Sequence, residues 1–329
     1  MKTFITALAL LFALASVTSM CFTATTRTLT KAGTQRATRK WPSFIEFRLQ
    51  ERTMTVIAMT REIGSLGTEV AARVGKRLGL EIVRSEVAAN NVARRLGVAE
   101  SAVSRYLDGS ASLLERWQVD RRKLFHYASE EILSLAQRGN VLIKGWGAAT
   151  MLRDVPQVIN VRVCAPMEFR VRVMMERQGR HDAATVQGEI ERFDAARART
   201  LRAYFNVEQE DAQLYHVVLN SERLSLDACV NAVCKLAEGS QFRDTFESRS
   251  ALANKLLEAK ISSALVDHIS VAMAPLGLSV SIANGKITLT GTTSSGSLRK
   301  RAEEIAHASA GMLQIDNRIL SVPTRGSAF

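Results

Sequence analysis

Cysteine is scarce in this chain, with four residues among 329, and this excludes the class of small domains held together by disulfides. Five histidines are scattered without the spacing of zinc ligands, so a structural zinc site is not expected. Aromatic residues make up only 6%, which means that leucine, valine, isoleucine and alanine must fill most of the core. We expect the cysteines to be buried thiols: Cys21, Cys164, Cys229 and Cys234.

The chain is neither a multi-span membrane protein nor a disordered one, because 47% of its residues are hydrophobic and 23% are charged. Its length suggests two globular units. The net charge is +12, but residues 1–53 contribute +6 through eight Lys/Arg and two Asp/Glu. The rest of the chain is only mildly basic, so we do not expect a nucleic acid as its partner.

The first 53 residues do not have the pattern of a folded domain. Lys2 precedes an apolar run over residues 4–17, which is too short to span a membrane but has the length of a signal peptide. Two interpretations remain open. If residues 1–22 are an export signal, the protein is periplasmic or associated with the envelope; if translation starts at Met54, it is cytoplasmic. We expect no transmembrane helix in the folded body.

Residues 54–237 alternate between strand and helix patterns, which predicts a parallel sheet covered by helices. The predicted strands cover residues 55–59, 141–143, 158–163 and 217–219. The predicted helices cover residues 69–78, 86–96, 99–107, 121–137 and 224–237, with one long helical segment from Pro166 to about Phe205.

The chain changes character after residue 237. Residues 238–249 are polar and lack a period, so they are predicted to be a linker. Residues 250–323 then follow the order αββαβ, with an Asn-Gly pair at 284–285 that strongly indicates a hairpin. The strand arms, second helix and last strand cover residues 278–282, 287–290, 297–309 and 314–321. We expect this module to fold on its own and to be released by proteolysis near Ser250.

A glycine-containing loop joins the first strand to the first helix. Gly64 and Gly67 permit a tight turn, and Ser65 and Thr68 offer hydroxyl groups. Backbone amides that converge at a helix N-terminus bind anions well. The loop therefore predicts either a phosphate site or a tight turn without a ligand.

The loop matches the P-loop pattern G-x-x-x-x-G-K-[ST] only in part. Thr60 and Leu66 occupy the two glycine positions, and Gly67 occupies the lysine position. Thr68 fits the position of the magnesium ligand. The backbone could still hold a phosphate, but the lysine charge is missing.

Residues 56–67, VIAMTREIGSLG, resemble the opening of the cytidylate kinase-like family, which usually reads ISREIGSGG. Further family motifs recur in the same order along residues 54–237. They are G-W-G-A at 145–148, A-P-M-E-F-R at 165–170, M-E-R at 175–177, D-x-x-R at 194–197 and L-N-S at 219–221.

This resemblance implies a fold like that of P-loop nucleoside monophosphate kinases, and transfer of the ATP γ-phosphoryl group to a nucleotide such as CMP with Mg²⁺. It assigns the ATP site to Arg61, Gly64, Ser65, Gly67 and Thr68, with Thr68 also on the metal. It assigns the acceptor site to Glu86, Arg170 and Arg177. Arg197 and Arg202 would neutralise the transferring phosphates, and Asp194 would orient an arginine or the acceptor sugar.

The chain departs from the family at positions that carry charge. Gly67 stands at the P-loop lysine position, Trp146 replaces an arginine, and Arg84 replaces a frequent aspartate. An aromatic ring cannot replace a bidentate phosphate ligand. We therefore expect weak or absent CMP phosphorylation, and a degenerate nucleotide sensor is the alternative interpretation.

The C-terminal module resembles a BON domain through its pattern V-x-x-G-x-V-x-L-x-G around residues 280–291. BON domains are small αβ modules, often in bacterial envelope proteins, and the resemblance implies a phospholipid or small-ligand partner without catalysis. Arg299, Lys300 and Arg301 are either contacts for anionic headgroups or an ordinary solvated helix face. An envelope protein that acts through this module is therefore a further alternative.

Overall fold

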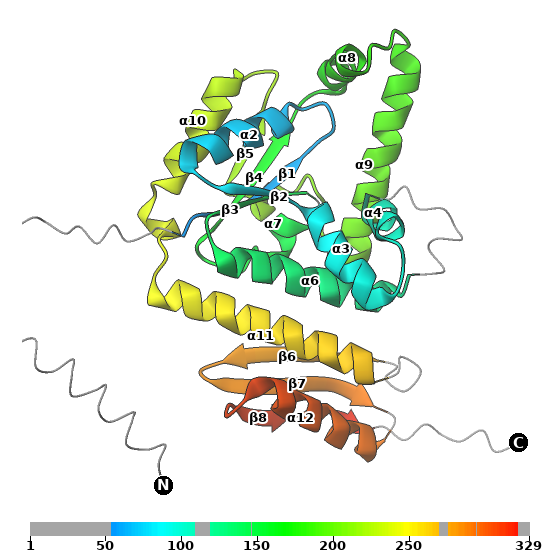
Figure 1. The fold of residues 1–329 in the computed structure, drawn as a ribbon, viewed down its shortest axis with the longest axis vertical. Helices are drawn as coiled ribbons and strands as arrows, with labels where there is room; N and C mark the ends of the chain where they lie inside the picture. The colour runs from blue at the N-terminus through cyan, green and yellow to red at the C-terminus, as the bar shows by residue number, and fades with distance from the viewer. Residues whose placement is uncertain (1–53, 109–118, 146, 270–275, 294, 322–329) are drawn as a thin grey trace, which may run out of the picture. The chain divides into compact units, whose positions relative to one another are not determined.

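The computed structural model describes residues 54–108, 119–145, 147–269, 276–293 and 295–321 (Figure 1). The leader over residues 1–53 lies outside the described residues, so the two interpretations of the start site stay predictions. Trp146 also lies outside them. Within the described part, no helix is long and apolar enough to cross a membrane.

The N-terminal domain is built on a five-stranded parallel sheet of order β2-β3-β1-β4-β5. Its strands are β1 (Val56–Arg61), β2 (Glu81–Arg84), β3 (Val141–Lys144), β4 (Val158–Cys164) and β5 (Val217–Asn220). The central strand β1 is almost continuously apolar, as expected for a strand that is covered on both faces. The predicted fold class is confirmed.

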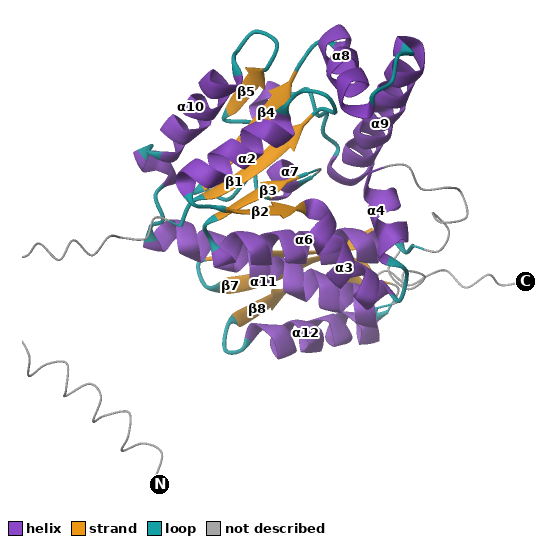
Figure 2. Cartoon of the chain, turned by 45° about the horizontal axis from the view of Figure 1, so that its top comes forward, coloured by secondary structure: helices purple, strands orange, loops and turns teal. Residues whose placement is uncertain are grey.

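Helices cover both faces of this sheet (Figure 2). They are α2 (Gly67–Leu78), α3 (Ser85–Leu96), α4 (Glu100–Asp108), α6 (Arg121–Arg138), α7 (Ala148–Met151), α8 (Met167–Gln178), α9 (Ala183–Phe205) and α10 (Leu226–Ala237). Ile57 and Met59 pack with apolar residues of α2 and α10, whereas Val56 and Ala58 pack with α6 and α7. Alternate side chains of β1 therefore reach opposite layers.

The prediction of one helical segment from Pro166 to Phe205 is wrong in one respect. The segment is two helices, α8 and α9, and Gly179 ends the first with a left-handed φ of 59°. Asp182 caps the second by accepting hydrogen bonds from the amides of Ala184 and Thr185. A glycine followed by an acidic N-cap residue is a stop-and-start signal that the helical pattern obscured.

The C-terminal module contains α11 (Phe246–His268), β6 (Leu276–Ala283), β7 (Lys286–Thr293), α12 (Gly296–Ala310), β8 (Gln314–Asn317) and β9 (Leu320–Ser321). β6 and β7 form the predicted hairpin, and Asn284 and Gly285 have φ values of 51° and 71° as a type I′ turn requires. The predicted last strand is two short strands, β8 and β9, which both pair parallel with β7.

Helix α11 belongs to two cores. Leu252, Leu256 and Ala259 pack in the cluster that contains β1 and α6, whereas Ile261 and Leu265 pack in the cluster formed by β6, β7 and α12. The helix begins inside the predicted linker, which also contains a short 3₁₀ turn, Ser240–Phe242, whose phenylalanine is buried. The boundary near Ser250 therefore lies within a helix, and independent folding of the module stays a prediction.

A fragment that starts at Phe246 is expected to fold around the core of Ile261 and Leu265 and to self-associate. The reason is that Leu252 and Leu256 lose the apolar surface that covers them in the full chain. Replacing both leucines by glutamate should keep the fragment monomeric in size-exclusion chromatography. In the full chain, the same double substitution should lower the free energy of unfolding by at least about 2 kcal/mol per site.

Two results would contradict this picture of a shared helix. An unfolded fragment, seen as poor dispersion in its NMR spectrum, would show that the module needs the N-terminal domain. A full chain whose urea unfolding is unchanged by the double substitution would show that Leu252 and Leu256 do not contribute to the core.

Candidate functional site

The loop between β1 and α2 presents an open helix N-terminus. No side chain caps α2, and its N-cap residue Leu66 has a left-handed φ of 55°. Among the described residues, the amides of Gly67, Thr68 and Glu69 have no hydrogen-bond acceptor. Three unsatisfied amides at the positive end of a helix dipole form a local environment that favours an anion.

Ser65 holds this loop to the sheet. Its Oγ donates to the carbonyl oxygens of Glu62 (2.8 Å) and Val163 (3.1 Å). Ser221, at the end of β5, donates its Oγ to the carbonyl oxygen of Ser65 at 2.7 Å. The hydroxyl of Ser65 therefore faces the protein, and its predicted contribution to an ATP site would be to position the backbone.

Both glycines of the loop lie where a side chain would clash with neighbouring atoms. A Cβ atom on Gly64, whose φ is 81°, would lie 2.5 Å from the carbonyl oxygen of Arg170. A Cβ atom on Gly67 would lie 2.6 Å from the Cβ of Arg61. The loop is consequently packed between the first turn of α8 and the end of β1, and its backbone geometry is tightly restricted.

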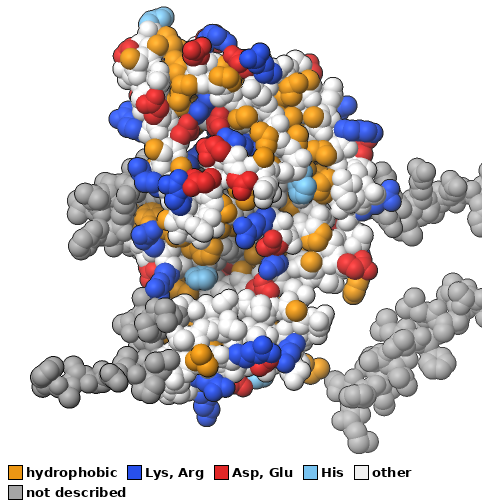
Figure 3. Space-filling model, turned by 180° about the vertical axis from the view of Figure 1, so that it is seen from behind, with side chains coloured by type: hydrophobic (Ala, Val, Ile, Leu, Met, Phe, Trp, Pro, Cys, Tyr) orange, Lys and Arg blue, Asp and Glu red, His pale blue; other side chains and the backbone are white. Residues whose placement is uncertain are grey.

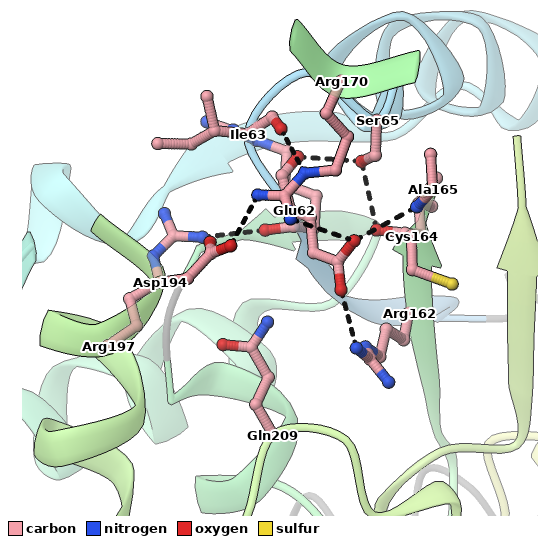
Figure 4. A network of polar contacts seen from close by, with 12 residues as sticks. Glu62, Ile63, Ser65, Arg162, Cys164, Ala165, Arg170, Asp194, Arg197 and Gln209 are labelled. Atoms are coloured by element: carbon pink, nitrogen blue, oxygen red, sulfur yellow. Dashed lines mark hydrogen bonds and ion pairs between the residues drawn. The ribbon is translucent and has the colours of Figure 1, made fainter. Parts of the chain in front are cut away.

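Glu62 occupies the centre of a polar cluster beside the loop (Figure 4). Arg162, on β4, donates to Oε1 of Glu62 at 2.7 Å, and the amide of Ala165 donates to Oε2 at 3.1 Å. Both side chains are largely buried, with 9% and 12% of their area exposed. Glu62 thereby ties the end of β1 to the end of β4.

Two arginines from the helical segment after β4 complete the cluster. Arg170 donates through Nε to the carbonyl oxygen of Ile63 (2.8 Å) and through its terminal nitrogen to Asp194 (2.7 Å). Arg197, one turn after Asp194 on α9, donates to the carbonyl oxygen of Arg61 at 2.7 Å. The helical segment α8–α9 is thus attached to the end of β1 and to the loop that follows it by two guanidinium groups.

The cluster carries more positive than negative charge. Its guanidinium groups include those of Arg162, Arg170 and Arg197, against the carboxylates of Glu62 and Asp194. Three guanidinium groups and two carboxylates leave a formal excess of one positive charge among these residues. Since this excess lies beside open amides at a helix N-terminus, the site is suited to a polyphosphate.

Comparison with protein-family models tests the family resemblance that these motifs suggest. The family model described as "Cytidylate kinase-like family" matches residues 56–223, slightly more than half of the chain. The chain belongs to the cytidylate kinase-like family. A BON domain model matches residues 254–323, so the chain also contains a BON domain.

Curated relatives of the kinase-like domain share about a quarter of its sequence. The cytidylate kinase of Pyrobaculum aerophilum is 25% identical over 177 residues, which are 54% of this chain and 89% of that protein. The cytidylate kinase of Staphylothermus marinus is 23% identical over 185 residues, covering 56% and 97%. A solved structure of an uncharacterized protein from Eubacterium ventriosum is 17% identical and covers 56% of this chain and 99% of that one, with a TM-score of 0.45.

The family position of Leu66 is usually glycine, and the structure shows the consequence of that replacement. Leu66 has positive φ, which is unfavourable for a residue with a branched side chain by about 1 kcal/mol or more. The loop therefore carries some backbone strain at Leu66, the position where the family motif usually has glycine.

Several predicted site residues lie outside the cluster. Arg177 forms an ion pair with Glu69 on α2, and Arg202 forms an exposed ion pair with Glu208. Glu86 lies on α3, but its side chain is outside the described part of the structure.

The structure brings together Arg61, Gly64, Ser65, Gly67, Arg170, Asp194 and Arg197. The roles assigned to all of these residues remain predictions.

Sequence reasoning missed three charged residues that the fold places at or beside this site. Glu62 stood inside the family motif, and Arg162 was a charge in an otherwise apolar strand, which is a usable signal. Lys144 ends β3 on the face of Leu142, which packs in the α2 cluster, and it is only 5% exposed. No local pattern marked Lys144 as distinct from a surface lysine.

A tyrosine and a cysteine lie beside the cluster, but neither has the properties of a nucleophile. Tyr215 donates its hydroxyl to the carbonyl oxygen of Gln209 at 3.0 Å, and burial raises the pKa of the phenol. The side chain of Gln209 points toward the cluster (Figure 4). Burial and the nearby Glu62 raise the pKa of the Cys164 thiol, which therefore stays protonated at neutral pH.

The cysteine prediction holds for Cys229 and Cys234, which are buried, whereas Cys164 is only half-buried. Cys21 lies outside the described residues. None of the three described cysteines forms a disulfide with another described cysteine.

A magnesium ion at this site would be held mainly by the phosphates of a bound nucleotide. Within the described residues, no group of three or more His, Cys, Asp or Glu side chains is arranged to hold a metal. Magnesium is commonly held by substrate phosphates and water with few protein ligands. Thr68 on the first turn of α2 is therefore the predicted protein ligand.

The basic residues of the BON domain are partly engaged within it. Arg299 donates to the carbonyl oxygen of Asn317 at 2.9 Å, and Arg301 pairs with Glu304 at 3.3 Å. Figure 3 shows positive and negative side chains interspersed over the visible face rather than gathered by sign. These observations favour the solvated-face interpretation of Arg299 and Arg301 over a headgroup site.

Proposed function

We propose that the kinase-like domain binds ATP at the loop of residues 64–68 and transfers its γ-phosphoryl group slowly to a nucleoside monophosphate. The observation that carries this proposal is the convergence of three guanidinium groups, those of Arg162, Arg170 and Arg197, beside the uncapped N-terminus of α2. Membership of the cytidylate kinase-like family and relatives named cytidylate kinase support the same reaction class.

The described residues would act by positioning and by charge stabilisation, which supply most of the catalysis in phosphoryl transfer. The amides of Gly67 and Thr68 would hold phosphate oxygens at the helix N-terminus. Arg197 would stabilise charge that develops on the transferring group, and Asp194 would orient Arg170. Bound magnesium would neutralise phosphate charge during the transfer.

Glu62 and Asp194 set the rigidity of this arrangement. They hold the guanidinium groups of Arg162 and Arg170 in fixed positions, so these groups need little reorganisation when a phosphate arrives. The helices α8 and α9 would act as the lid, because Arg170 and Arg197 attach them to the loop. A lid of this kind excludes water from the reacting phosphates.

Turnover with ATP and CMP is expected to be roughly 100-fold below the range of about 1–100 per second that is typical of kinases. The missing lysine at Gly67 removes a charge-assisted contact, which contributes about 1.5–3 kcal/mol in the transition state. The Gly67→Lys variant is not expected to restore the rate, because its Cβ would lie 2.6 Å from the Cβ of Arg61 and 3.3 Å from that of Val163.

A coupled assay for ADP release measures this prediction, with binding of ATP and CMP followed separately by calorimetry. The matched control is Arg199→Gln, which removes an exposed arginine on the same helix as Arg197. It should leave nucleotide binding unchanged, whereas Arg197→Gln should weaken it. Failure to bind any nucleotide in the presence of magnesium would overturn the proposed function, and ordinary kinase turnover would overturn the expected low rate.

A nucleotide sensor without turnover is the second candidate function. The observation that favours it is that Arg162 and Arg170 are already paired with Glu62 and Asp194 and are buried. Saturable binding of nucleotide with no detectable product would support the sensor over the kinase.

A further inference from the structure

A cavity of about 270 Å³ lies where α6 meets the BON domain. Arg122 and His126 of α6 form one wall. The opposite wall is apolar and is formed mainly by Leu265, Val266 and Ile269, with Leu278 of β6. The volume is near the lower end of the range for small-molecule sites.

The polar side chains of this cavity differ in their contacts: Ser262 donates its hydroxyl to the carbonyl oxygen of Glu258, whereas Arg122 and His126 face the cavity from α6. Arg122 and His126 are four residues apart on α6, so their side chains share one face of the helix. Among the described residues, neither side chain makes a hydrogen bond or an ion pair. None of the described residues that line the cavity is acidic, and the nearby carboxylate that acts on His126 is that of Asp120. Arg122 is exposed, and its guanidinium group beside the imidazole offers hydrogen-bond donors to an anion.

Other cationic side chains near the contact of α6 with α11 are paired with carboxylates. Arg95 pairs with Glu130 at 2.6 Å and with Asp267 at 3.5 Å, and Lys123 lies 3.8 Å from Asp267. The hydroxyl of Tyr127 also donates to Asp267. Asp267 thus pairs with Arg95 and Lys123, whereas Arg122 has no ion pair among the described residues.

The same contacts join three helices close to the cavity. Arg95 stacks over the ring of Tyr127 at 3.8 Å from its centroid, and Asp267 connects α11 to both residues. These interactions join α3, α6 and α11, the last two of which contribute residues to the cavity. A pre-formed cavity binds a ligand with less loss of conformational entropy than one that must open.

We propose that this cavity binds a small amphiphilic anion, with a carboxylate or phosphate group on Arg122 and His126 and a short aliphatic body against Leu265, Val266 and Leu278. The site is composite, since its charged wall comes from the kinase-like domain and its apolar wall from the BON domain. Burial and the charge of Arg122 lower the pKa of His126, so the imidazole is neutral at neutral pH and donates one N–H. The proposal does not depend on nucleotide binding at the loop of residues 64–68.

Calorimetric titration of the full chain with sodium octanoate tests the proposal, with octyl phosphate and octanol as companion probes. We expect one saturable site for octanoate with a dissociation constant of about 1 mM or tighter. Octanol, which has the apolar body without the charge, should bind at least about tenfold more weakly. Similar affinity for octanoate and octyl phosphate is expected, because both present an anion to the same two groups.

Three variants locate the site. Arg122→Gln should weaken octanoate binding at least about tenfold, since it removes a charge-assisted contact. Val266→Phe should abolish binding of octanoate by filling the cavity while leaving both polar groups in place. Arg138→Gln, an equal charge change at the exposed far end of α6, should have no effect.

Thermal melting of each variant establishes that it is folded before its affinity is compared. If Val266→Phe fails to fold, His126→Gln replaces it as the second variant, with an expected loss of affinity smaller than that of Arg122→Gln. Absence of saturable octanoate binding would overturn the proposal. Equal affinity for octanol and octanoate would also overturn it, as would unchanged binding in both Arg122→Gln and the second variant.

Discussion

Gly64→Ala is expected to lower the free energy of unfolding of the kinase-like domain by about 3 kcal/mol or more. Gly64 has a φ of 81°, where a residue with a Cβ is disfavoured by about 1–2 kcal/mol. Its Cβ would also lie 2.5 Å from the carbonyl oxygen of Arg170 and 2.9 Å from its Cα. These are backbone atoms of α8, so the contact cannot be relieved by rotating a side chain.

Substitutions at two other glycines measure the cost of the backbone conformation separately from the cost of the close contact. Gly97→Ala tests the conformational cost alone, because Gly97 has a φ of 70° and nothing within 4 Å of the Cβ position. Gly188→Ala tests neither cost, since Gly188 is inside α9 with open space around it, and it should be stabilising by about 0.5–1 kcal/mol. Urea unfolding measures all three variants. If Gly64→Ala costs no more than Gly97→Ala, the close approach to Arg170 is not rigid.

Arg170→Met is expected to lower the free energy of unfolding by about 3–5 kcal/mol. The arginine is 5% exposed, and its removal leaves the carboxylate of Asp194 and the carbonyl oxygen of Ile63 without their donor. The guanidinium group of Arg170 also lies 3.8 Å from the carboxylate of Glu62. After the substitution, Arg162 is the cation that remains paired with Glu62. Because Ile63 belongs to the phosphate loop, nucleotide affinity should fall together with stability.

Controls on α8 and α9 show whether the effect arises from the buried ion pair. Arg172→Met removes an exposed arginine of the same helix and should change stability by less than about 0.5 kcal/mol. Combining Arg170→Met with Asp194→Leu should recover part of the loss, because the uncompensated carboxylate is removed as well. Additive effects in this double-mutant cycle would contradict an energetic coupling between Arg170 and Asp194.

The secondary structure of this protein was largely predictable from local sequence. Apolar runs such as residues 158–163 and the alternation with helical patterns predicted a parallel sheet, because period and turn chemistry act over a few residues. The hairpin at Asn284-Gly285 followed from the positive φ that only a few residues adopt at low cost. Where a helical pattern ran on, as across Gly179, local periodicity hid the break between α8 and α9.

The candidate site was predictable only in its phosphate loop and its arginine-rich segment. Glu62 and Arg162 are about a hundred residues apart in the chain and meet because β1 and β4 are neighbours in the sheet. Likewise, Arg170 reaches Ile63 only because α8 returns across the end of β1. The sequence contained these residues but not the strand order that makes them partners.

The sharing of α11 between two cores was decided by tertiary structure alone. By itself, the sequence determined that residues 250–323 contain a hairpin and two helical patterns, and that a polar segment precedes them. It did not determine that Leu252 and Leu256 pack with β1 and α6 while Ile261 and Leu265 pack with β6 and β7. An apolar stripe along a helix specifies that a surface must be buried, but the element that buries it depends on contacts far away in the chain. The cavity between Arg122, His126 and α11 is another result of tertiary structure. Its walls come from two domains, and no local pattern in either one indicates that these residues meet.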